Sequence, residues 1–231
     1  MKSVKIGDKH LYNDFNLIMN SREITPPSIK KETIDVPGSD GVLDFSESLT
    51  GDVKYNNRTL TINLTMIDST SNFDNRISEL YNYLHGKKFK IIFDDNPEFY
   101  YIGRSEINSF ASDSLIGLIV LECDVEPYKY DIISSNVDWP WDTFNFENGI
   151  INETKDLTVD GELEVSIYGR RKHVVPIIES STAMQVVFNS QTYNLVQGSN
   201  EVYDIEIIEG ENKLKFIGNG TVNIDYRGGS L

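Results

Sequence analysis

Two hydrophobic periods occur in the first part of the chain, and each predicts a different element. From Arg58 to Ile67 apolar and polar residues alternate strictly, which predicts a strand with one buried face. The apolar set of this strand is Leu60, Ile62, Leu64 and Met66. From Asn72 to Lys88 the apolar residues recur at helical intervals instead, and Gly86 stands where a helix would end. These apolar residues are Phe73, Ile77, Leu80, Tyr81 and Leu84, and they predict an amphipathic helix of about three turns.

Three further strand-like runs follow the helix, at residues 87–95, 98–107 and 114–127. In the last of them, Ile119, Leu121, Cys123 and Val125 share one face. We therefore interpret Cys123 as a small core residue rather than as a nucleophile, because a reactive thiol needs an exposed, electropositive setting.

The second half of the chain has a different pattern, with short alternating runs from Ile150 onward and no helical period. Six or seven such runs, separated by turn residues, predict a small β-sandwich. Residues 133–149 carry scattered aromatic residues without any period, which is typical of a connection. We see no internal repeat. The predicted organisation is a first domain over residues 1–132, a linker over 133–149 and a second domain over 150–231, in a mainly β (α+β) fold with one helix in the first domain.

A long stretch between Ile34 and Val53 combines turn residues with the apolar residues Val42, Leu43, Phe45 and Leu49. Residues 36–39 fit a type II turn, with Pro37 in its second position and Gly38 in its third, and Asp40–Gly41 is a second reversal signal. A loop of about 16 residues is longer than an ordinary connection, so something must order it.

The apolar residues of this loop need a cover. Burial of one Val, Leu or Phe side chain contributes roughly 1.5–3 kcal/mol, so leaving four in water forfeits several kcal/mol and favours aggregation. If the loop projects from its own domain, a neighbouring subunit is the natural cover. The alternative is that the loop folds back as a lid on its own domain.

The charge of the chain restricts its partners. The 231 residues include 21 Lys and Arg against 36 Asp and Glu, a formal net charge of -15. Up to Ile132 there are 14 basic and 21 acidic residues, and after it 7 and 15. A groove that grips phosphates needs clustered Lys and Arg, so we expect no sequence-specific nucleic-acid binding by either half. The acidity serves solubility, or it is a surface that must not retain nearby DNA.

Residue usage also bears on the cellular setting. A single Cys excludes an intramolecular disulfide. The amino-terminal residues show no apolar core of signal-peptide length, and no window approaches the roughly 20 apolar residues of a membrane span. We expect a protein that is made and folded in the cytosol and that has no membrane partner.

No constellation of catalytic residues is apparent. The histidines His10, His85 and His173 lie far apart without metal-ligand spacing. Asp94 and Asp95 fit a solvated turn in which the two side chains point apart. The glycine-rich stretches 217–222 and 226–231 lack the setting of a phosphate loop and are interpreted as turns. We predict no enzyme activity, no catalytic residues, no bound metal and no cofactor.

Aromatic residues of the second half keep a carbohydrate-binding function open. Exposed aromatic side chains on a β-sandwich suit saccharide binding, and Tyr168, Tyr193, Tyr203 and Tyr226 are available. A sandwich also needs buried aromatic residues, and the sequence does not decide which face each tyrosine takes.

Three consecutive segments resemble the distal tail protein family of long, flexible-tailed bacteriophages and prophages of Gram-positive hosts. They are residues 36–62, 80–104 and 118–130, with the elements Pro-Gly-x-Asp-Gly, Leu-His-Gly-Lys and Glu-Pro-Tyr-Lys-Tyr. The resemblance covers about residues 1–132, and the closing IDYRGGSL also resembles the end of such proteins. Residues 136–222 resemble no family that we can name.

The resemblance implies a structural protein that forms a homo-oligomeric ring, usually a hexamer, at the virion tail tip. The ring would be assembled in the bacterial host cytoplasm, join the tail tube protein to tail-tip or baseplate hub proteins, and let DNA pass. The implied folds are a tail-tube-like first domain, a β-sandwich around the DNA channel, and a galectin-like or jelly-roll second domain that faces outward. Host cell-wall saccharide is left open as a further partner.

The resemblance also suggests that the long loop is an arm lying on the next subunit. The candidate subunit-interface residues are the turn formers Pro37, Gly38, Asp40 and Gly41 and the anchors Val42, Leu43 and Phe45. Two other functions are compatible with the sequence: a carbohydrate-binding adhesin module on a tail or cell surface, and a tail component of a phage-derived bacteriocin particle.

Overall fold

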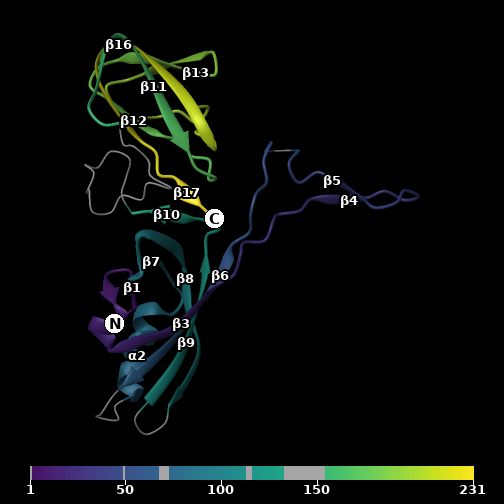
Figure 1. The fold of residues 1–231 in the computed structure, drawn as a ribbon, viewed down its shortest axis with the longest axis vertical. Coiled ribbons are helices and arrows are strands. Elements are labelled where there is room, and N and C mark those ends of the chain that lie inside the picture. The colour runs from purple at the N-terminus through teal and green to yellow at the C-terminus, as the bar shows by residue number, and fades with distance from the viewer. Residues whose placement is uncertain (1, 49, 68–72, 113–115, 133–153) are drawn as a thin grey trace. The chain divides into compact units, whose positions relative to one another are not determined.

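The structure is a computed structural model of the chain, and it describes residues 2–48, 50–67, 73–112, 116–132 and 154–231. The chain divides into two compact units, Met1–Lys129 together with Leu231, and Tyr130–Ser230 (Figure 1). We call these the first and the second domain. The predicted linker, residues 133–149, lies outside the described residues, and its role stays a prediction. The predicted mainly β fold is confirmed.

The first domain is built on one antiparallel sheet with the strand order β2-β1-β7-β8-β9-β6-β3. The strands are β1 (Val4–Ile6), β2 (Lys9–His10), β3 (Leu17–Ile24), β6 (Arg58–Ile67), β7 (Lys87–Phe93), β8 (Asn96–Ser112) and β9 (Ile116–Val125). A separate two-stranded sheet pairs β4 (Thr33–Asp35) with β5 (Val42–Asp44). The helices are α1 (Leu11–Phe15), which the sequence analysis missed, and α2 (Phe73–Leu84).

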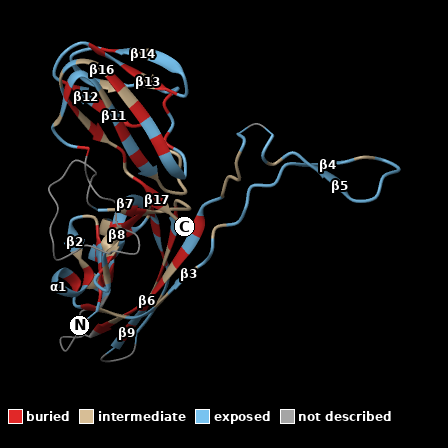
Figure 2. Cartoon of the chain, turned by 45° about the horizontal axis from the view of Figure 1, so that its top comes forward, coloured by how far each residue is buried: buried red, intermediate tan, exposed pale blue. Residues whose placement is uncertain are grey.

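The core of the first domain lies on one face of this sheet. The predicted apolar set of β6 is buried, and β9 pairs with β6 so that Leu60 lies opposite Cys123 and Ile62 opposite Leu121. From α2, Ile77 and Leu80 join the same buried cluster, which appears in red in Figure 2. The strand and the helix that these two patterns predict are therefore both confirmed, because each pattern supplies one continuous apolar stripe.

Two details of α2 add to this picture. Gly86 follows the helix with φ +75 and donates its N–H to the Ser105 carbonyl, so it ends the helix as predicted. Tyr81 is exposed, although its spacing placed it on the apolar face, and its ring lies 5.4 Å from that of His85.

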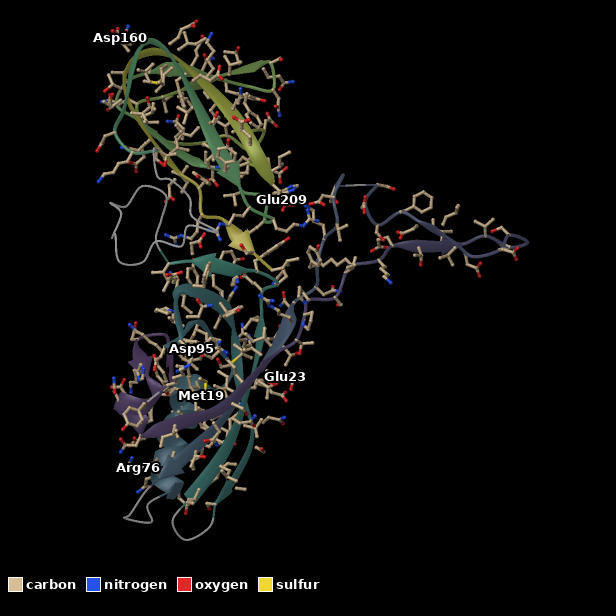
Figure 3. All side chains as sticks on the ribbon, viewed as in Figure 1. Met19, Glu23, Arg76, Asp95, Asp160 and Glu209 are labelled. Atoms are coloured by element: carbon tan, nitrogen blue, oxygen red, sulfur yellow. The ribbon has the colours of Figure 1, made fainter. Side chains whose placement is uncertain are left out.

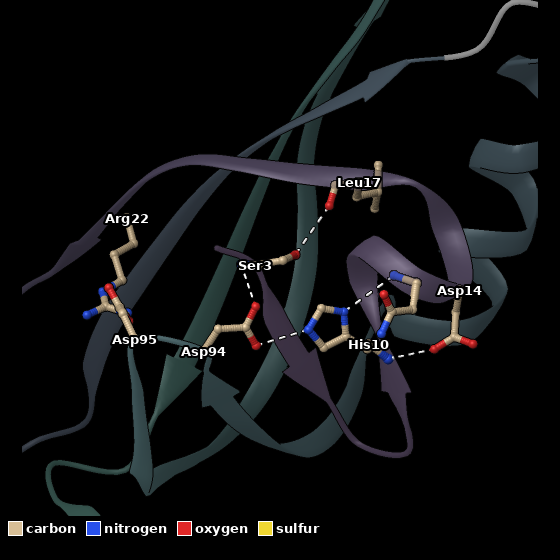
Figure 4. A network of polar contacts seen from close by, with 8 residues as sticks. Ser3, His10, Asp14, Leu17, Arg22, Asp94 and Asp95 are labelled. Carbon is tan, nitrogen blue, oxygen red and sulfur yellow. Dashed lines mark hydrogen bonds and ion pairs between the residues drawn. The ribbon is translucent and has the colours of Figure 1, made fainter. Parts of the chain in front are cut away.

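The turn between β7 and β8 is more than a solvated connection (Figure 4). The carboxylate of Asp94 accepts a hydrogen bond from the Ser3 N–H at 2.7 Å and lies 3.0 Å from His10 Nε2. Asp95 forms an ion pair with Arg22 on β3. The two carboxylates point apart and lie in an exposed turn, as predicted, and each of them also ties the turn to a different part of the domain.

The second domain is also a β structure, in which β16 is the shared strand. Its strands are β11 (Leu157–Gly169), β12 (Ile177–Ser180), β13 (Met184–Phe188), β14 (Gln191–Leu195), β15 (Gly198–Glu201), β16 (Gly210–Asp225) and β17 (Gly229–Ser230), which pairs with β10 (Lys129–Asp131). The order of the main ladder is β14-β13-β16-β12-β15, and β11 pairs with β16 along its whole length. Ile178, Val186, Leu214 and Phe216 belong to its buried cluster. The galectin-like or jelly-roll assignment stays a prediction.

One predicted turn of the second domain is in fact a continuous strand. The stretch 217–222 lies within β16 and pairs with β11 throughout. Gly218 and Gly220 have φ of +150 and +147, and a Cβ on them would lie 2.7 Å from Met184 Cβ and 2.6 Å from Ser181 Oγ. These glycines let the β12–β13 connection and the start of β13 approach β16 closely. Glycine in a strand can therefore mark a close backbone approach instead of a turn.

An internal repeat is present, contrary to the sequence interpretation. Residues 195–202 (LVQGSNEV) and 207–214 (IIEGENKL) share one pattern of apolar residues around Gly-x-Asn. In the first copy, Asn200 Oδ1 accepts from the Val196 N–H at 2.8 Å, and its Nδ2 donates to the carbonyls of Val196 and Gly198 at 2.8 and 2.9 Å.

The second copy repeats this geometry bond for bond. Asn212 Oδ1 accepts from the Ile208 N–H at 3.0 Å, and its Nδ2 donates to the carbonyls of Ile208 and Gly210 at 2.8 and 2.9 Å. Gly198 and Gly210 have φ of +101 and +96, which favours glycine at this place in the turn. Each copy is a tight turn closed by an Asn side chain, and each one starts a strand.

Candidate subunit-contact site

Residues 25–57, which we call the arm, join β3 to β6 and include the β4–β5 hairpin. Figure 1 shows the arm extending beyond the sheet of the first domain. Its root continues the β3–β6 ladder by backbone hydrogen bonds of 2.8–3.0 Å that join Thr25 to Thr59, Ser28 to Asn56 and Lys30 to Lys54. The Tyr55 ring contacts that of Tyr128 at 6.2 Å between centroids. The root is therefore anchored to the domain on the side of β6.

The turn at the far end of the arm has the predicted geometry. Gly38 has φ +88, and the Ser39 N–H donates to the Val36 carbonyl at 3.1 Å, as a type II turn with Pro37 in second position requires. Asp40–Gly41, the second predicted reversal, also contains a residue in the left-handed conformation, because Gly41 has φ +74. The type II turn is confirmed, and a side chain at either glycine would strain the backbone although the surrounding space is open.

A small polar network fixes the strand that follows this turn. Asp44 Oδ1 accepts from both the N–H and the hydroxyl of Ser46, and Ser46 Oγ accepts from the Glu32 N–H on the opposite strand at 2.9 Å. The two bonds from Ser46 lower the pKa of Asp44 below its ordinary value of 3.8. Between them, the Phe45 N–H donates to the Glu32 carbonyl at 2.8 Å. The backbone around Phe45 is thus ordered without help from the core.

The apolar residues of the arm are exposed in the single chain. Ile34 is 55% exposed, Val42 58%, Leu43 52% and Phe45 42%, and Figure 2 shows most of the arm in the colour of exposed residues. The alternative in which this loop folds back as a lid is therefore wrong. Ile34 was missed as a candidate because it was interpreted as the end of a strand. Its position opposite Leu43 is visible only from the pairing of the two strands.

All seven predicted interface residues lie together at the distal end of the arm. Pro37, Gly38, Asp40 and Gly41 form the exposed turn, Val42 and Leu43 lie in β5, and Phe45 follows it. Leu49 lies outside the described residues. The side chains of the arm stand clear of the sheet in Figure 3. Their contact with another subunit stays a prediction.

The face of the sheet opposite the core is polar and mainly acidic over β8 and β9. Glu106 on β8 lies opposite Glu122 on β9, and Asn108 Nδ2 donates to Glu122 Oε1 at 2.8 Å. Asp124 on the same face lies opposite Arg104, whose guanidinium donates to the Gly86 carbonyl. At the start of β9 the face becomes apolar, because Ile116 and Leu118 are exposed.

Besides the two-residue strand β2, two strand edges of this sheet lack a partner among the described strands. β3 ends the sheet and pairs only with β6. On the other side, β7 accompanies β8 as far as the Lys87–Ser105 pair, and the Ile107 N–H beyond it donates to His85 Nδ1 at 3.1 Å, so the open edge of β8 is residues 108–112. Because β3, β6, β9 and β8 alternate in direction, the two open edges run in opposite directions. Exposed edges of this kind are templates for pairing with another chain.

The candidate metal and thiol residues give simple results in the part of the chain that the structure describes. No group of three or more His, Cys, Asp or Glu side chains in them is placed to hold a metal ion. Cys123 is fully buried in the core, as predicted, and burial raises the pKa of its thiol to about 11. Neither helix of the described ranges is long and apolar enough to cross a membrane.

The tyrosines of the second domain divide between its surface and its interior. Tyr168 is 62% exposed and Tyr203 is 77% exposed. Tyr226 is buried, and burial raises the pKa of its hydroxyl to about 12. Tyr193 is partly buried and packs against the core of the domain. Two of the four candidate tyrosines are therefore available to a ligand.

Comparison with known proteins places this geometry in a phage context. Residues 6–115 match the model of the phage tail protein RIFT-related domain. Over 100% of both chains, the protein is similar to the crystal structure of the SPP1 Dit (gp 19.1) protein, with a TM-score of 0.64 and 16% sequence identity. That protein is described as a paradigm of the hub adsorption apparatus in Gram-positive infecting phages. No curated protein matches the chain. The resemblance to phage distal tail proteins is thus confirmed, and the likeness to SPP1 Dit establishes the fold.

Proposed function

We propose that this chain is a non-enzymatic distal tail protein of a bacteriophage, located at the virion tail tip. It forms a homo-oligomeric ring that joins the tail tube protein to the tail-tip hub proteins and lets DNA pass. The observation that carries the proposal is the pair of open strand edges on a domain that matches a phage tail model.

The two edges support a ring made of identical subunits. When β3 of one copy meets residues 108–112 of β8 in the next copy, the strands run antiparallel, as every other pair in the sheet does. The surfaces that meet are different, so the contact is head-to-tail, and such contacts close into rings when the rotation per subunit permits. Pairing of this kind also removes the edges that otherwise favour aggregation.

The arm adds a second contact to the same neighbour. It begins at Thr25, directly after β3, so a copy that pairs with β3 lies beside the root of the arm. The exposed apolar side chains of the arm then lose their contact with water against that copy. Both contacts join the same two copies and therefore reinforce each other.

The polar face of the sheet is the candidate lining of the DNA channel. The buried face is taken up by α2 and the core, so the face with Glu106, Glu122 and Asp124 is the one left to line a lumen. Carboxylates repel the DNA phosphates and displace no counterions from the DNA. In this proposal DNA therefore slides past without being retained. The chain's net charge of -15 agrees with this function.

Contacts with other tail proteins involve a different end of the sheet. Ile116 and Leu118 are exposed where β9 pairs with the end of β6, whereas the arm joins the start of β6. This apolar pair is the candidate contact for the tail tube or for a hub protein. The second domain is the outward module in this proposal.

Electron microscopy of the purified full chain tests the proposal. We expect particles with a central pore and a uniform number of subunits, and a hexamer is the expected number from the family resemblance. A population of single 26.3-kDa subunits at every concentration examined would refute the ring.

Binding of cell-wall saccharide is a second candidate function, and the exposed Tyr168 and Tyr203 favour it. A glycan array with the full chain and with its Tyr168→Ala and Tyr203→Ala variants tests it. Specific binding that the variants lose would support an adsorption role in addition to the ring. Absence of binding by rings that remain intact would leave the scaffold function alone.

A further inference from the structure

The β4–β5 hairpin of the arm has two faces of different composition. In its register Ile34 lies opposite Leu43, and Thr33 lies opposite Asp44. Because side chains alternate between the faces of a strand, Ile34 and Leu43 share one face. Phe45 lies two residues after Leu43 and its backbone pairs with Glu32, so its side chain belongs to the same face. The opposite face carries Thr33, Asp35, Val42 and Asp44.

Exposure alone does not separate these two faces, but charge does. Val42 is 58% exposed and is the most exposed apolar residue of the hairpin, yet it lies directly opposite Asp35 and next to Asp44 on its strand. On the other face, Ile34, Leu43 and Phe45 form an apolar group whose one carboxylate, Glu32, lies at the end of the group opposite Phe45. Burying a carboxylate against another acidic chain is costly, whereas burying the apolar group is favourable.

We infer that the arm binds a second copy of this chain through the Ile34–Leu43–Phe45 face alone, and that the face with Val42 stays in water. This inference rests on the proposed ring and deepens it by naming the contacting face. It also changes the set of anchors: Ile34 joins it and Val42 leaves it.

Two features of the arm favour a second copy as the partner. The arm leaves the sheet at the open edge strand β3, so the copy that pairs with β3 is the nearest surface to its root. The chain is acidic, with a net charge of -15, so two copies approach best through surfaces with few carboxylates. The apolar face of the hairpin is such a surface.

The hairpin is also ordered before it binds. The type II turn at Gly38 and the network of Asp44, Ser46 and Glu32 fix both strands within the single chain. A preformed hairpin loses less conformational entropy on binding than a disordered loop would. The same order holds the two faces apart, which makes a face-specific test possible.

The first experiment compares three single substitutions in the full chain: Ile34→Ser, Leu43→Ser and Val42→Ser. Light scattering after size exclusion, over a range of concentrations, gives the concentration at which half of the subunits are assembled. For Ile34→Ser and Leu43→Ser we expect this concentration to rise by about tenfold to a hundredfold, from the loss of one buried apolar side chain. For Val42→Ser, the matched control, we expect a change of less than about threefold.

The second experiment reads the burial of each face without disrupting assembly. Leu43→Cys and Val42→Cys variants are treated with a maleimide reagent before and after assembly. The native Cys123 contributes little background, because it is fully buried. We expect assembly to protect the thiol at position 43 at least about tenfold and to leave the thiol at position 42 reactive.

The outcomes separate this inference from the proposed function. If the wild-type chain never assembles, the ring itself is refuted. If it assembles but all three serine variants assemble equally well, or if Val42→Ser is as harmful as Leu43→Ser, the ring stands and the one-face contact is wrong. Equal protection of the two cysteines likewise overturns the inference.

Discussion

Strands β3 and β6 and the arm between them form one long hairpin, and its two halves treat apolar residues in opposite ways. In the sheet half, Leu60 and Ile62 are fully buried against β9 and the core. In the arm half, Ile34 and Leu43 lie directly opposite each other on paired strands and are more than half exposed. Both halves alternate, so alternation predicts a strand but does not say what covers its apolar face.

The difference between the halves lies in their neighbours. The sheet half has further strands and a helix to pack against, whereas the arm is a two-stranded ribbon, which is marginally stable by itself in water. In the proposed function, the sheet half supplies the stability of the domain and the arm half supplies the contact between copies. The following predictions test this division from the largest expected effect to the smallest.

The largest effect is expected on assembly. The double substitution Leu43→Ser with Phe45→Ser removes two apolar side chains from each contact, which together contribute roughly 3–6 kcal/mol. We expect soluble single subunits with the unfolding temperature of the wild-type chain below its assembly concentration, measured by sedimentation velocity and thermal unfolding. Rings of unchanged size would show that the arm contributes nothing to association.

The next effect concerns the stability of the domain. Ile62→Ala opens a cavity in the core and should lower the free energy of unfolding by about 2–5 kcal/mol. The matched substitution Leu43→Ala, in a chain kept below its assembly concentration, should change it by less than about 0.5 kcal/mol. Urea unfolding measures both values. Equal losses of unfolding free energy would mean that the arm is part of the core and would contradict the proposed difference between the two halves.

A smaller effect separates the two copies of the Gly-x-Asn turn in the second domain. Asn212 is buried and Asn200 is partly exposed, although their hydrogen bonds are the same. Asn212→Ala leaves buried backbone groups without a partner and should cost about 1–3 kcal/mol, and Asn200→Ala should cost less because water replaces its bonds. The two variants are compared by urea unfolding. A larger loss for Asn200→Ala would contradict this view of burial.

The smallest effect is a pH dependence confined to the arm. The pKa of Asp44 is lowered below 3.8 by its bonds from Ser46, so the carboxylate network is complete above the ordinary Asp range. It should be lost only as pH falls through that lowered pKa. An NMR titration of the Ser46 amide should therefore show a midpoint below that of an ordinary Asp. A midpoint at or above 3.8 would contradict the network.

Much of the first domain could be predicted from sequence, because its patterns are local. The alternation of β6, the period of α2 and the turn at Gly38 each require only nearby residues, and each was confirmed. Cys123 was placed correctly because its neighbours on the same face are all apolar. The exposure of the arm was expected only as one of two alternatives. Whether other residues cover its apolar side chains depends on contacts that are distant in sequence.

The errors share a physical cause, which is that one residue type has several uses. Gly218 and Gly220 were interpreted as a turn, but they allow a close approach to Met184 and Ser181 within a continuous strand. The contacts of Asp94 with Ser3 and His10 were missed because both partners are distant in sequence. Such partners become visible only when the fold brings them together.

The candidate site was predicted from composition, whereas the proposed one-face contact rests on the register of the hairpin. Val42, Leu43 and Phe45 were selected because they are apolar and adjacent to turns, which cannot tell one face of a hairpin from the other. Only the pairing of Ile34 with Leu43 shows which side chains act together. The register was not predictable, because the turn that sets it spans six residues between β4 and β5.

A density map of the assembled particle by cryo-electron microscopy tests the central claim most directly. The account predicts a ring in which the apolar face of every arm, with Ile34, Leu43 and Phe45, lies against the adjacent copy while Val42 faces solvent. A ring whose arms extend into solvent without touching a neighbour would contradict it.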